Sequence, residues 1–309
     1  MRRAQRSRFR LVLAFVLGTG VATVHPANRL MASAAGDPGT ASQPPQKPTQ
    51  AMLKPVSATS APDIPFHEAT VEERLLDLAN QSRRQAGAPP LTLDPGLSRA
   101  ARIHAQAMVD ARQLSHQFTG EPSLPQRLAD RTSLQLDQEG ENVALDYNAD
   151  DGHNHLMHSP PHRANLLNPA YNVVGLGVVR GGDRLYIVQD FGHALPSYSL
   201  PEVKQQVASA VNLIRNQLRL SNLPRQDLVT ADEAACSMAH ADKLGTTPVH
   251  ALANRFTVLT YTSLHPETLP SEANHAIASH NLRSFYVGAC YSRTETYPTG
   301  VYWVVLALD

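Results

Sequence analysis

Residues 172–191, NVVGLGVVRGGDRLYIVQDF, contain two runs of β-type residues separated by a turn signal. Asn172 to Val179 and Arg184 to Phe191 are rich in valine, leucine, isoleucine and tyrosine. Between them, Gly181-Gly182-Asp183 supplies residue types that accept the backbone angles of a tight turn. The stretch therefore predicts an antiparallel β-hairpin.

Two helices are predicted before this hairpin. Thr70-Val71-Glu72-Glu73 has the spacing of a capping box, and Gly87 marks the end of the helix that follows it. Asp94 is placed to cap a second helix, with Pro95 at its first position. His104 lies on the apolar stripe of that helix, so we interpret it as a hydrogen-bonded core histidine and not as a ligand.

After the second helix the helical periodicity fades, and we expect a Gly/Pro-punctuated loop from His116 until about Leu156. Helices, a loop and then an antiparallel hairpin predict an α+β fold in which helices are layered on a sheet.

The N-terminus predicts export. Arginines at positions 2, 3, 6, 8 and 10 precede an apolar run from Leu11 to Val24, and Ala32-Ser33-Ala34 offers a signal-peptidase site. We expect residues 1–34 to be a signal peptide and the mature chain to be secreted, either periplasmic or extracellular. An uncleaved anchor is the alternative, although this run is short for a bilayer span, which needs roughly 20 apolar residues. No other stretch of the sequence is long and apolar enough, so no membrane span is expected in the mature chain.

Composition separates the rest of the chain into a spacer and two folded parts. Residues 35–66 contain seven prolines among Ser, Thr, Gln and Ala, which predicts a disordered linker. We expect folded domains at 67–197 and 198–309. The whole chain has 27 Lys+Arg and 27 Asp+Glu, and residues 1–34 hold six arginines and no acid, so the mature chain is mildly acidic. That balance argues against a nucleic-acid partner.

Six short motifs follow one another in the first folded part. They are Leu91-Thr-Leu-Asp94-Pro95-x-Leu97-Ser-x-Ala-Ala, Leu114-Ser-His116, Gly140-Glu141-Asn142-Val-Ala, Ser159-Pro-Pro-His162-Arg163-Ala-Asn165-Leu-Leu-Asn168-Pro, Gly175-Leu-Gly177 and Gln189-Asp-Phe191-Gly. In this order they resemble the CAP superfamily, also called SCP-like, and most of all its bacterial secreted branch. The resemblance covers about residues 70–195 and implies a three-layer α-β-α sandwich with a surface cleft.

Members of this superfamily line the cleft with two histidines and two acids. The resemblance assigns the histidines to His116 and His162 and one acid to Glu141. The second acid is missing: Ser159 stands near the place where eukaryotic members have it, and we include this serine among the cleft residues. The neighbouring pair Asp150-Asp151 could replace the missing acid.

Two chemistries are open to this trio. His116, His162 and Glu141 could be three ligands of an open zinc site with an activated water, which would give a metal-dependent peptidase or esterase with Zn²⁺ as cofactor. Alternatively they form a hydrogen-bonded network that fixes the loops. We favour the second interpretation and assign no catalytic residue, because the sequence shows neither a nucleophile motif nor an oxyanion device.

A histidine-rich tract precedes the last of these residues. His153, His155 and His158 join His162 within ten positions, which could suggest a second metal site. Pro160 and Pro161 argue against one continuous ligand face, so we expect a polar loop that leads into the motif around His162.

The second half resembles a degenerate copy of the first. Val207, Ala210, Asn212 and Arg215 lie 132 residues after Leu75, Leu78, Asn80 and Arg83, and two β-type runs, Phe285 to Arg293 and Gly300 to Leu308, lie near its end. We therefore expect a smaller CAP-like unit at 198–309. The site motifs are absent from it: with an offset of 134, His250 falls opposite His116, but no Gly-Glu-Asn follows.

The chain has only two cysteines, Cys236 and Cys290, and an even count in an exported protein favours a disulfide between them. Two free buried thiols are the alternative. For the whole protein we expect a non-catalytic extracellular binding module whose ligand is a lipid, an envelope glycan or another protein. The alternative is the metal-dependent hydrolase described above.

Overall fold

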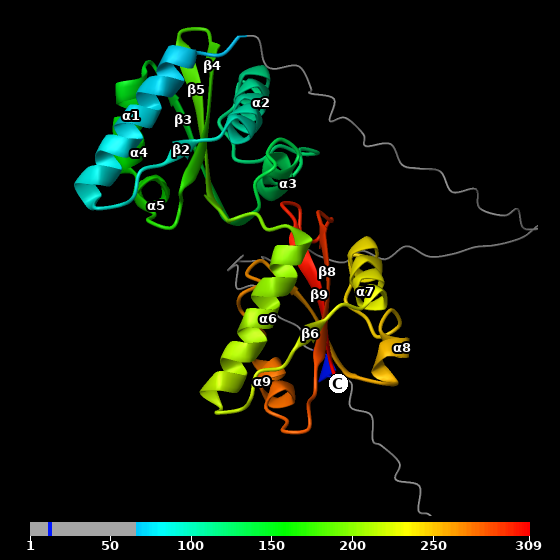
Figure 1. Ribbon diagram of the computed structural model, residues 1–309. Helices are drawn as coiled ribbons and strands as arrows, with labels where there is room; N and C mark the ends of the chain where they lie inside the picture. The colour runs from blue at the N-terminus through cyan, green and yellow to red at the C-terminus, as the bar shows by residue number, and fades with distance from the viewer. Residues whose placement is uncertain (1–11, 14–65) are drawn as a thin grey trace, which may run out of the picture. The chain divides into compact units, whose positions relative to one another are not determined.

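The computed structural model describes residues 12–13 and 66–309 (Figure 1). The expected signal peptide and linker lie outside the described residues, apart from Phe66 and the two-residue strand β1 (Val12–Leu13), which pairs in parallel with strand β7. We call residues 66–197 the first lobe and residues 198–309 the second lobe, and we describe each by itself. Together they give an α+β fold with two mixed sheets.

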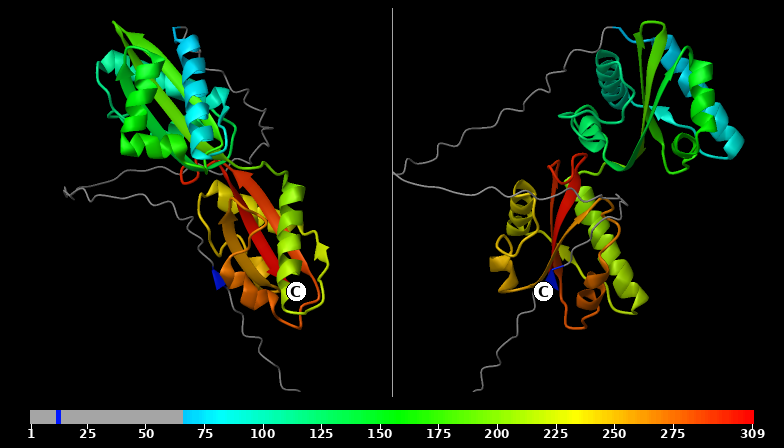
Figure 2. Two further views of the ribbon diagram at one scale, coloured as in Figure 1. Left: turned by 90° about the vertical axis from the view of Figure 1, so that its left-hand side faces the viewer. Right: turned by 180° about the vertical axis from the view of Figure 1, so that it is seen from behind.

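The first lobe contains one four-stranded sheet covered by helices on both faces. Its elements in chain order are α1 (Ala69–Ala86), β2 (Thr92–Leu93), α2 (Pro95–Ala111), α3 (Leu124–Ala129), β3 (Leu136–Asp146), α4 (Ala149–His158), α5 (Pro160–Leu167), β4 (Val173–Gly181) and β5 (Arg184–Ala194). The strand order is β2-β4-β5-β3, with β2 parallel to β4 and the other pairs antiparallel. Helices α1, α4 and α5 lie on one face and α2 on the other (Figures 1 and 2).

The predicted hairpin is confirmed. Strands β4 and β5 pair antiparallel as far as Gly181 opposite Arg184, so the turn consists of Gly182 and Asp183. Gly182 has a φ of 68°, which a residue without a Cβ adopts at little cost. Eight consecutive residues of β5 are buried, because helices cover both faces of the sheet.

The start of the first helix differs from the prediction. Helix α1 begins one residue before Thr70, its N-cap is Glu68, and no side chain caps it. Thr70 therefore lies inside the helix and not at its N-cap. Glu72, in the first turn of α1, accepts three hydrogen bonds from Arg102 and one from the backbone N–H of Val178. The cap of α2 is as predicted, with Asp94 accepting a 2.7 Å hydrogen bond from the backbone N–H of Leu97.

The region after His116 is more ordered than expected. Helix α3, strand β3 and helix α4 all lie within the stretch that we expected to be a loop, and the histidine-rich tract is part of α4 and α5. Pro160 and Pro161 occupy the first turn of α5, so the break between the two helices falls at Ser159. The prediction of a break was right and the prediction of a loop was wrong.

The second lobe repeats the strand order of the first. Its elements are α6 (Leu200–Gln217), β6 (Arg225–Gln226), α7 (Val229–His240), α8 (His250–Ala253), β7 (Thr257–Ser263), α9 (Ser271–Ile277), β8 (Phe285–Ser292) and β9 (Val301–Leu308). The order β7-β9-β8-β6, with β6 parallel to β8, matches β3-β5-β4-β2 strand for strand. Helices α6 and α9 pack on one face of the sheet and α7 on the other.

A buried arginine occupies the same place in both lobes. Arg83 in α1 donates to the backbone oxygens of Pro89, Leu166, Asn168 and Tyr171. Arg215 in α6 donates to those of Ser221, Ile277 and Ser279. Each guanidinium satisfies carbonyls in loops and at helix ends that the regular hydrogen-bond pattern leaves without partners.

Close packing of the sheet on a helix is also repeated. A Cβ added at Gly175 in β4 would lie 2.1 Å from the backbone carbon of Leu97 in α2. A Cβ at Gly288 in β8 would lie 2.1 Å from the backbone oxygen of Ala231 in α7. Leu97 and Ala231 are 134 residues apart, so this contact fixes which residues of the two lobes correspond.

The predicted disulfide between Cys236 and Cys290 is formed, with a Cα–Cα distance of 5.1 Å. The correspondence places these cysteines where the first lobe has Arg102 and Gly177, another point of close approach between α2 and β4. The disulfide thus links helix to sheet at a position where the first lobe relies on a glycine.

Replacing both cysteines with serine will lower the free energy of unfolding by about 3–4 kcal/mol, because the bridge closes a long loop in the unfolded chain. Chemical denaturation followed by the fluorescence of Trp303, the only tryptophan and buried in the second lobe, measures the change. An unchanged unfolding midpoint would contradict this prediction.

Candidate functional site

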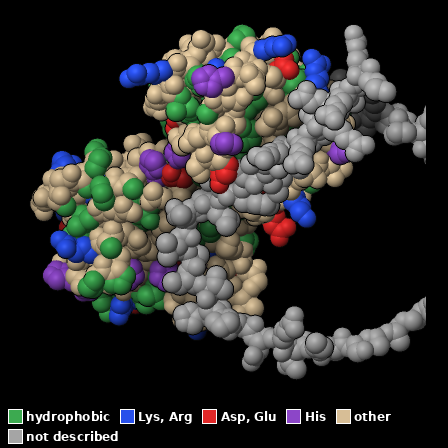
Figure 3. Space-filling view, turned by 90° about the horizontal axis from the view of Figure 1, so that it is seen from below, with side chains coloured by type: hydrophobic (Ala, Val, Ile, Leu, Met, Phe, Trp, Pro, Cys, Tyr) green, Lys and Arg blue, Asp and Glu red, His purple; other side chains and the backbone are tan. Residues whose placement is uncertain are grey.

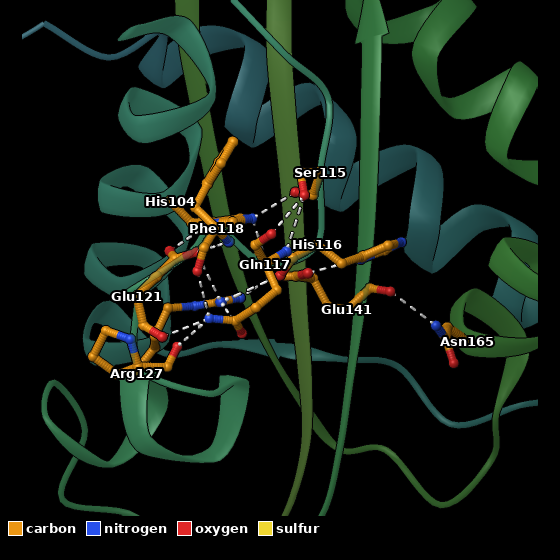
Figure 4. Close-up of polar contacts among 10 residues, drawn as sticks. His104, Ser115, His116, Gln117, Phe118, Glu121, Arg127, Glu141 and Asn165 are labelled. Atoms are coloured by element: carbon orange, nitrogen blue, oxygen red, sulfur yellow. Dashed lines mark hydrogen bonds and ion pairs between the residues drawn. The ribbon is translucent and has the colours of Figure 1, made fainter. Parts of the chain in front are cut away.

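Two of the three predicted site residues are in direct contact. His116, in the segment between α2 and α3, places its Nδ1 2.8 Å from Oε1 of Glu141 in β3 (Figure 4). His162 in α5 brings its ring to a centroid distance of 6.4 Å from the ring of His116. The His116 side chain is 56% exposed, whereas Glu141 is buried, so a solvent-facing imidazole lies over a buried carboxylate.

The Glu141 carboxylate is held from both sides. Its Oε2 accepts a very short hydrogen bond from Nη2 of Arg127 in α3, and its Oε1 lies against His116. Nη1 of Arg127 also donates to the backbone oxygen of His116 at 3.3 Å and lies 3.5 Å from Oε2 of Glu121. Arg127 is buried, so one desolvated guanidinium joins two carboxylates to the segment that carries His116.

A second buried acid lies opposite Glu141 on the neighbouring strand. Asp190 in β5 is directly opposite Glu141 in the antiparallel register, and its side chain is fully buried. Burial raises the pKa of Asp190 well above its ordinary value, and the neighbouring Glu141 carboxylate raises it further. Both effects favour the protonated form of Asp190.

Asp190→Asn will stabilise the protein above pH 4. In the folded state the pKa of Asp190 is raised, so its contribution to stability is complete below its unfolded value of about 3.9 and is lost as the pH rises toward the folded value. Asparagine does not titrate and avoids this loss. The difference in unfolding free energy between variant and wild type should increase with pH, to an order of 1–3 kcal/mol near pH 7.

Denaturation of both proteins at pH 4, 5.5 and 7 gives this difference. A constant difference over that range would contradict a protonated Asp190.

Amide side chains attach helix α5 to strand β3. Asn142 donates to the backbone oxygen of His162 at 3.0 Å, and Asn165 donates to the backbone oxygen of Glu141 at 3.1 Å. Partial burial lowers the pKa of His162, and the nearby His116 lowers it further, so this ring is neutral near pH 7. Ser159 is half-buried at the junction of α4 and α5, where its backbone N–H caps α4, and its role as a cleft residue stays a prediction.

The other acids and histidines considered from the sequence have separate partners. Asp150, proposed as a replacement for the missing acid, pairs with Arg74 on the surface, so that assignment is wrong. His153 lies 2.8 Å from the hydroxyl of Ser82, and His155 contacts Asp146. These contacts attach α4 to helix α1 and strand β3, and none of them involves Glu141.

Three members of the site, Arg127, Glu121 and Asp190, were not predicted from the sequence. A signal for Asp190 was present, since an acid within the apolar run of residues 184–191 must be buried if that run is a central strand. Nothing comparable marks Arg127 or Glu121.

The geometry does not fit a zinc ion with His116, Glu141 and His162 as its three ligands. Oε2 of Glu141 is engaged by a guanidinium, whose charge repels a cation, and Oε1 faces His116. Among residues 66–309, no group of three or more His, Cys, Asp or Glu side chains is arranged to hold a metal ion. The metal assignment stays a prediction, and it requires Glu141 to exchange Arg127 for the ion.

The second lobe shows which residues occupy the positions of the site in a sheet of the same strand order. Thr260 pairs with Val305 in the second lobe as Glu141 pairs with Asp190 in the first. Helix α7 carries Met238 at the position of His104 in α2. All three replacements are buried. The same strand order thus forms around uncharged residues, so the buried charges of the first lobe are not a requirement of the fold.

Comparisons with known proteins find similarity over part of the chain. Residues 76–191 match the model of the CAP, or cysteine-rich secretory protein, family. The chain is 31% identical over 161 residues to the uncharacterised protein YkwD of Bacillus subtilis strain 168, an alignment that covers 52% of this chain and 60% of YkwD. The chain therefore spans less than two thirds of that relative.

Among solved structures, an extracellular SCP-domain protein of Bacillus anthracis is similar, with 27% identity, 41% of each chain covered and a TM-score of 0.36. A cysteine-rich secretory protein of Staphylococcus aureus shares 20% identity, with 42% of this chain and 40% of that chain covered and a TM-score of 0.35. In the part of this chain that the structure describes, no helix combines the length and apolarity needed to cross a bilayer.

Proposed function

We propose that this protein is an extracellular binding module that holds its ligand at the surface formed by His116 and His162. The match of residues 76–191 to the CAP family model supports this proposal. In this proposal the protein binds its ligand and does not catalyse a reaction on it. Its export is supported by the arginine-rich, apolar N-terminal pattern and by the extracellular and secretory descriptions of the two similar structures.

The observation that carries this proposal is the buried charge network under the two rings. Burying the charges of Arg127 and Glu141 costs free energy that uncharged residues avoid, and the second lobe has Thr260 and Val305 where the first has Glu141 and Asp190. Because these buried charges are present in the sheet of the first lobe and not at the matching positions of the second, they support a role in function. It presents one exposed and one half-buried imidazole at fixed positions, which suits recognition by hydrogen bonds.

The same network argues against hydrolysis as the main activity. A general base needs a free lone pair facing substrate or water, whereas both oxygens of Glu141 are engaged by side chains. The metal-dependent hydrolase remains the second candidate, supported by the two histidines alone.

For the ligand we propose a lipid, an envelope glycan or a protein. Equal numbers of acidic and basic residues do not favour nucleic acid. On the face drawn in Figure 3, the Lys and Arg side chains are scattered and form no continuous basic surface.

Mass spectrometry of species that copurify with the secreted protein tests the binding function. We expect a bound species in the wild type that is lost from His116→Ala and from His162→Ala. The matched control is His250→Ala in the second lobe, the position that corresponds to His116, and it should retain the species. Retention in both site variants would place binding elsewhere. Zn²⁺-dependent turnover of peptide or ester substrates that disappears in His116→Ala would favour the hydrolase.

We further propose that the second lobe is a degenerate CAP-like copy with a packing role, with the boundary near residues 197 and 198. The shared strand order, the paired arginines and the paired glycines support it. Expression of residues 67–197 alone tests this boundary, since a cooperative unfolding transition is expected.

A further inference from the structure

We propose that His104 is a positioning residue of the candidate site, which fixes the segment that carries His116 by donating hydrogen bonds from both of its ring nitrogens. It touches no ligand surface itself: its side chain is fully buried in α2. The inference rests on the proposed function only in taking the His116 surface to be the site.

The ring of His104 lies between the two ends of a short segment, residues 115–121. Its Nε2 is 2.9 Å from the backbone oxygen of Ser115, and its Nδ1 is 2.6 Å from Oε1 of Glu121 (Figure 4). Between these ends, the ring of Phe118 packs against His104 at a centroid distance of 5.9 Å. The His104 side chain therefore contacts Ser115, which precedes His116, and both Phe118 and Glu121, which follow it.

The chemistry of the two acceptors determines the state of the ring. A backbone carbonyl can only accept, so Nε2 must carry a hydrogen. The Glu121 carboxylate accepts from the backbone N–H of Phe118 through its Oε2, which also lies 3.5 Å from the guanidinium of Arg127. A charged carboxylate also only accepts, so Nδ1 must carry a hydrogen as well.

The positive ring is balanced by its surroundings. The charged groups facing it are Glu121, Glu141 and Arg127, with Nε2 of His104 lying 3.9 Å from Oε2 of Glu141. Two cations and two carboxylates give a neutral cluster when Asp190 holds its proton. The cluster is thus consistent with a doubly donating His104.

The second lobe provides a natural comparison. Met238 corresponds to His104 and is completely buried within an apolar cluster. Since methionine fills this position in a like fold, packing alone does not demand a histidine. The requirement comes from the segment that carries His116. This goes beyond the interpretation of His104 as a core histidine, which its burial and two hydrogen bonds confirm.

Nitrogen-15 NMR of the wild-type protein tests the donor state directly, because each ring N–H of His104 gives its own signal. We expect both N–H signals near pH 7. Observation of only one would overturn the proposal.

His104→Met tests the positioning role. We expect amide hydrogen exchange at Phe118 to be at least tenfold faster and the ring signals of His116 to shift, while Trp303 fluorescence and exchange in β5 stay unchanged. Gln106→Ala, on the same helix and bonded only to Asp110, should change none of these. A folded His104→Met protein with unchanged Phe118 exchange and His116 signals would overturn the proposal.

Glu121→Gln covers the case in which His104→Met does not fold, because it retains the shape of the segment and removes its charge. We expect faster amide exchange at Phe118 and a shift of the His116 ring signals, as in His104→Met. The absence of both changes would overturn the positioning role of His104. None of these measurements uses a ligand, so failure of the proposed binding function and failure of this inference give different results.

Discussion

Arg83→Met will destabilise the first lobe by about 4–6 kcal/mol, the largest effect expected of any single substitution here. Methionine keeps much of the aliphatic length but donates no hydrogen bond. Four backbone oxygens, two of them accepting buried hydrogen bonds, lose their partner, and each unsatisfied group costs about 1–3 kcal/mol. Water entering the opened site offsets part of that sum.

Burial lowers the pKa of Arg83, but arginine remains charged at all ordinary pH values. The stabilisation is therefore independent of pH in the neutral range, and the loss in Arg83→Met should be the same at pH 6 and pH 8. A loss that changes strongly over this range would show that carboxylates elsewhere are responsible.

Arg215→Met is the matched comparison, because Arg215 makes three such bonds in the second lobe. It should cost less than Arg83→Met and should appear in the fluorescence of Trp303, whereas Arg83→Met should appear in the hydrogen exchange of first-lobe peptides. Equal and small effects of both variants would mean that water replaces the guanidinium at little cost.

The sequence predicted the parts of this fold whose stability is local. The hairpin of residues 172–191 and the cap at Asp94 depend on residues close in sequence, and both are confirmed. Strand β3 was missed, because Glu139 and Glu141 interrupt its apolar pattern, and the arginine that pairs with Glu141 comes from another part of the fold. Thr70 is not the cap, because α1 begins one residue earlier, at Ala69.

The residues of the candidate site also differ in whether the sequence predicts them. The contact between His116 and Glu141 was expected only through the family resemblance, since 25 residues separate them. Arg127 lies on a six-residue helix without a sequence pattern of its own, and its importance depends on the two carboxylates that converge on it. The register of β3 and β5, which places Asp190 opposite Glu141, becomes known only when the strands are paired.

Arg127→Met will cost about 3–5 kcal/mol at neutral pH, the second largest effect expected, because it leaves buried carboxylates without their cation. Glu141 loses its very short hydrogen bond, and Glu121 loses a neighbour at 3.5 Å. The segment that carries His116 also loses the bond from Arg127 to its backbone oxygen. Binding at His116 should therefore weaken along with stability.

Hydrogen exchange of first-lobe peptides and chemical denaturation measure the loss, with the exposed Arg163→Met as the control that should change neither. Adding Glu141→Gln to Arg127→Met should recover more than half of the lost stability, since the uncompensated buried charge is then removed. Binding should stay weak in the double variant, because Glu141→Gln removes the carboxylate partner of His116. A double variant that is less stable than Arg127→Met alone would show that Glu141 stabilises the lobe through contacts other than this ion pair. The buried charges would then be structural, and the comparison with Thr260 and Val305 would lose its force as an argument for function.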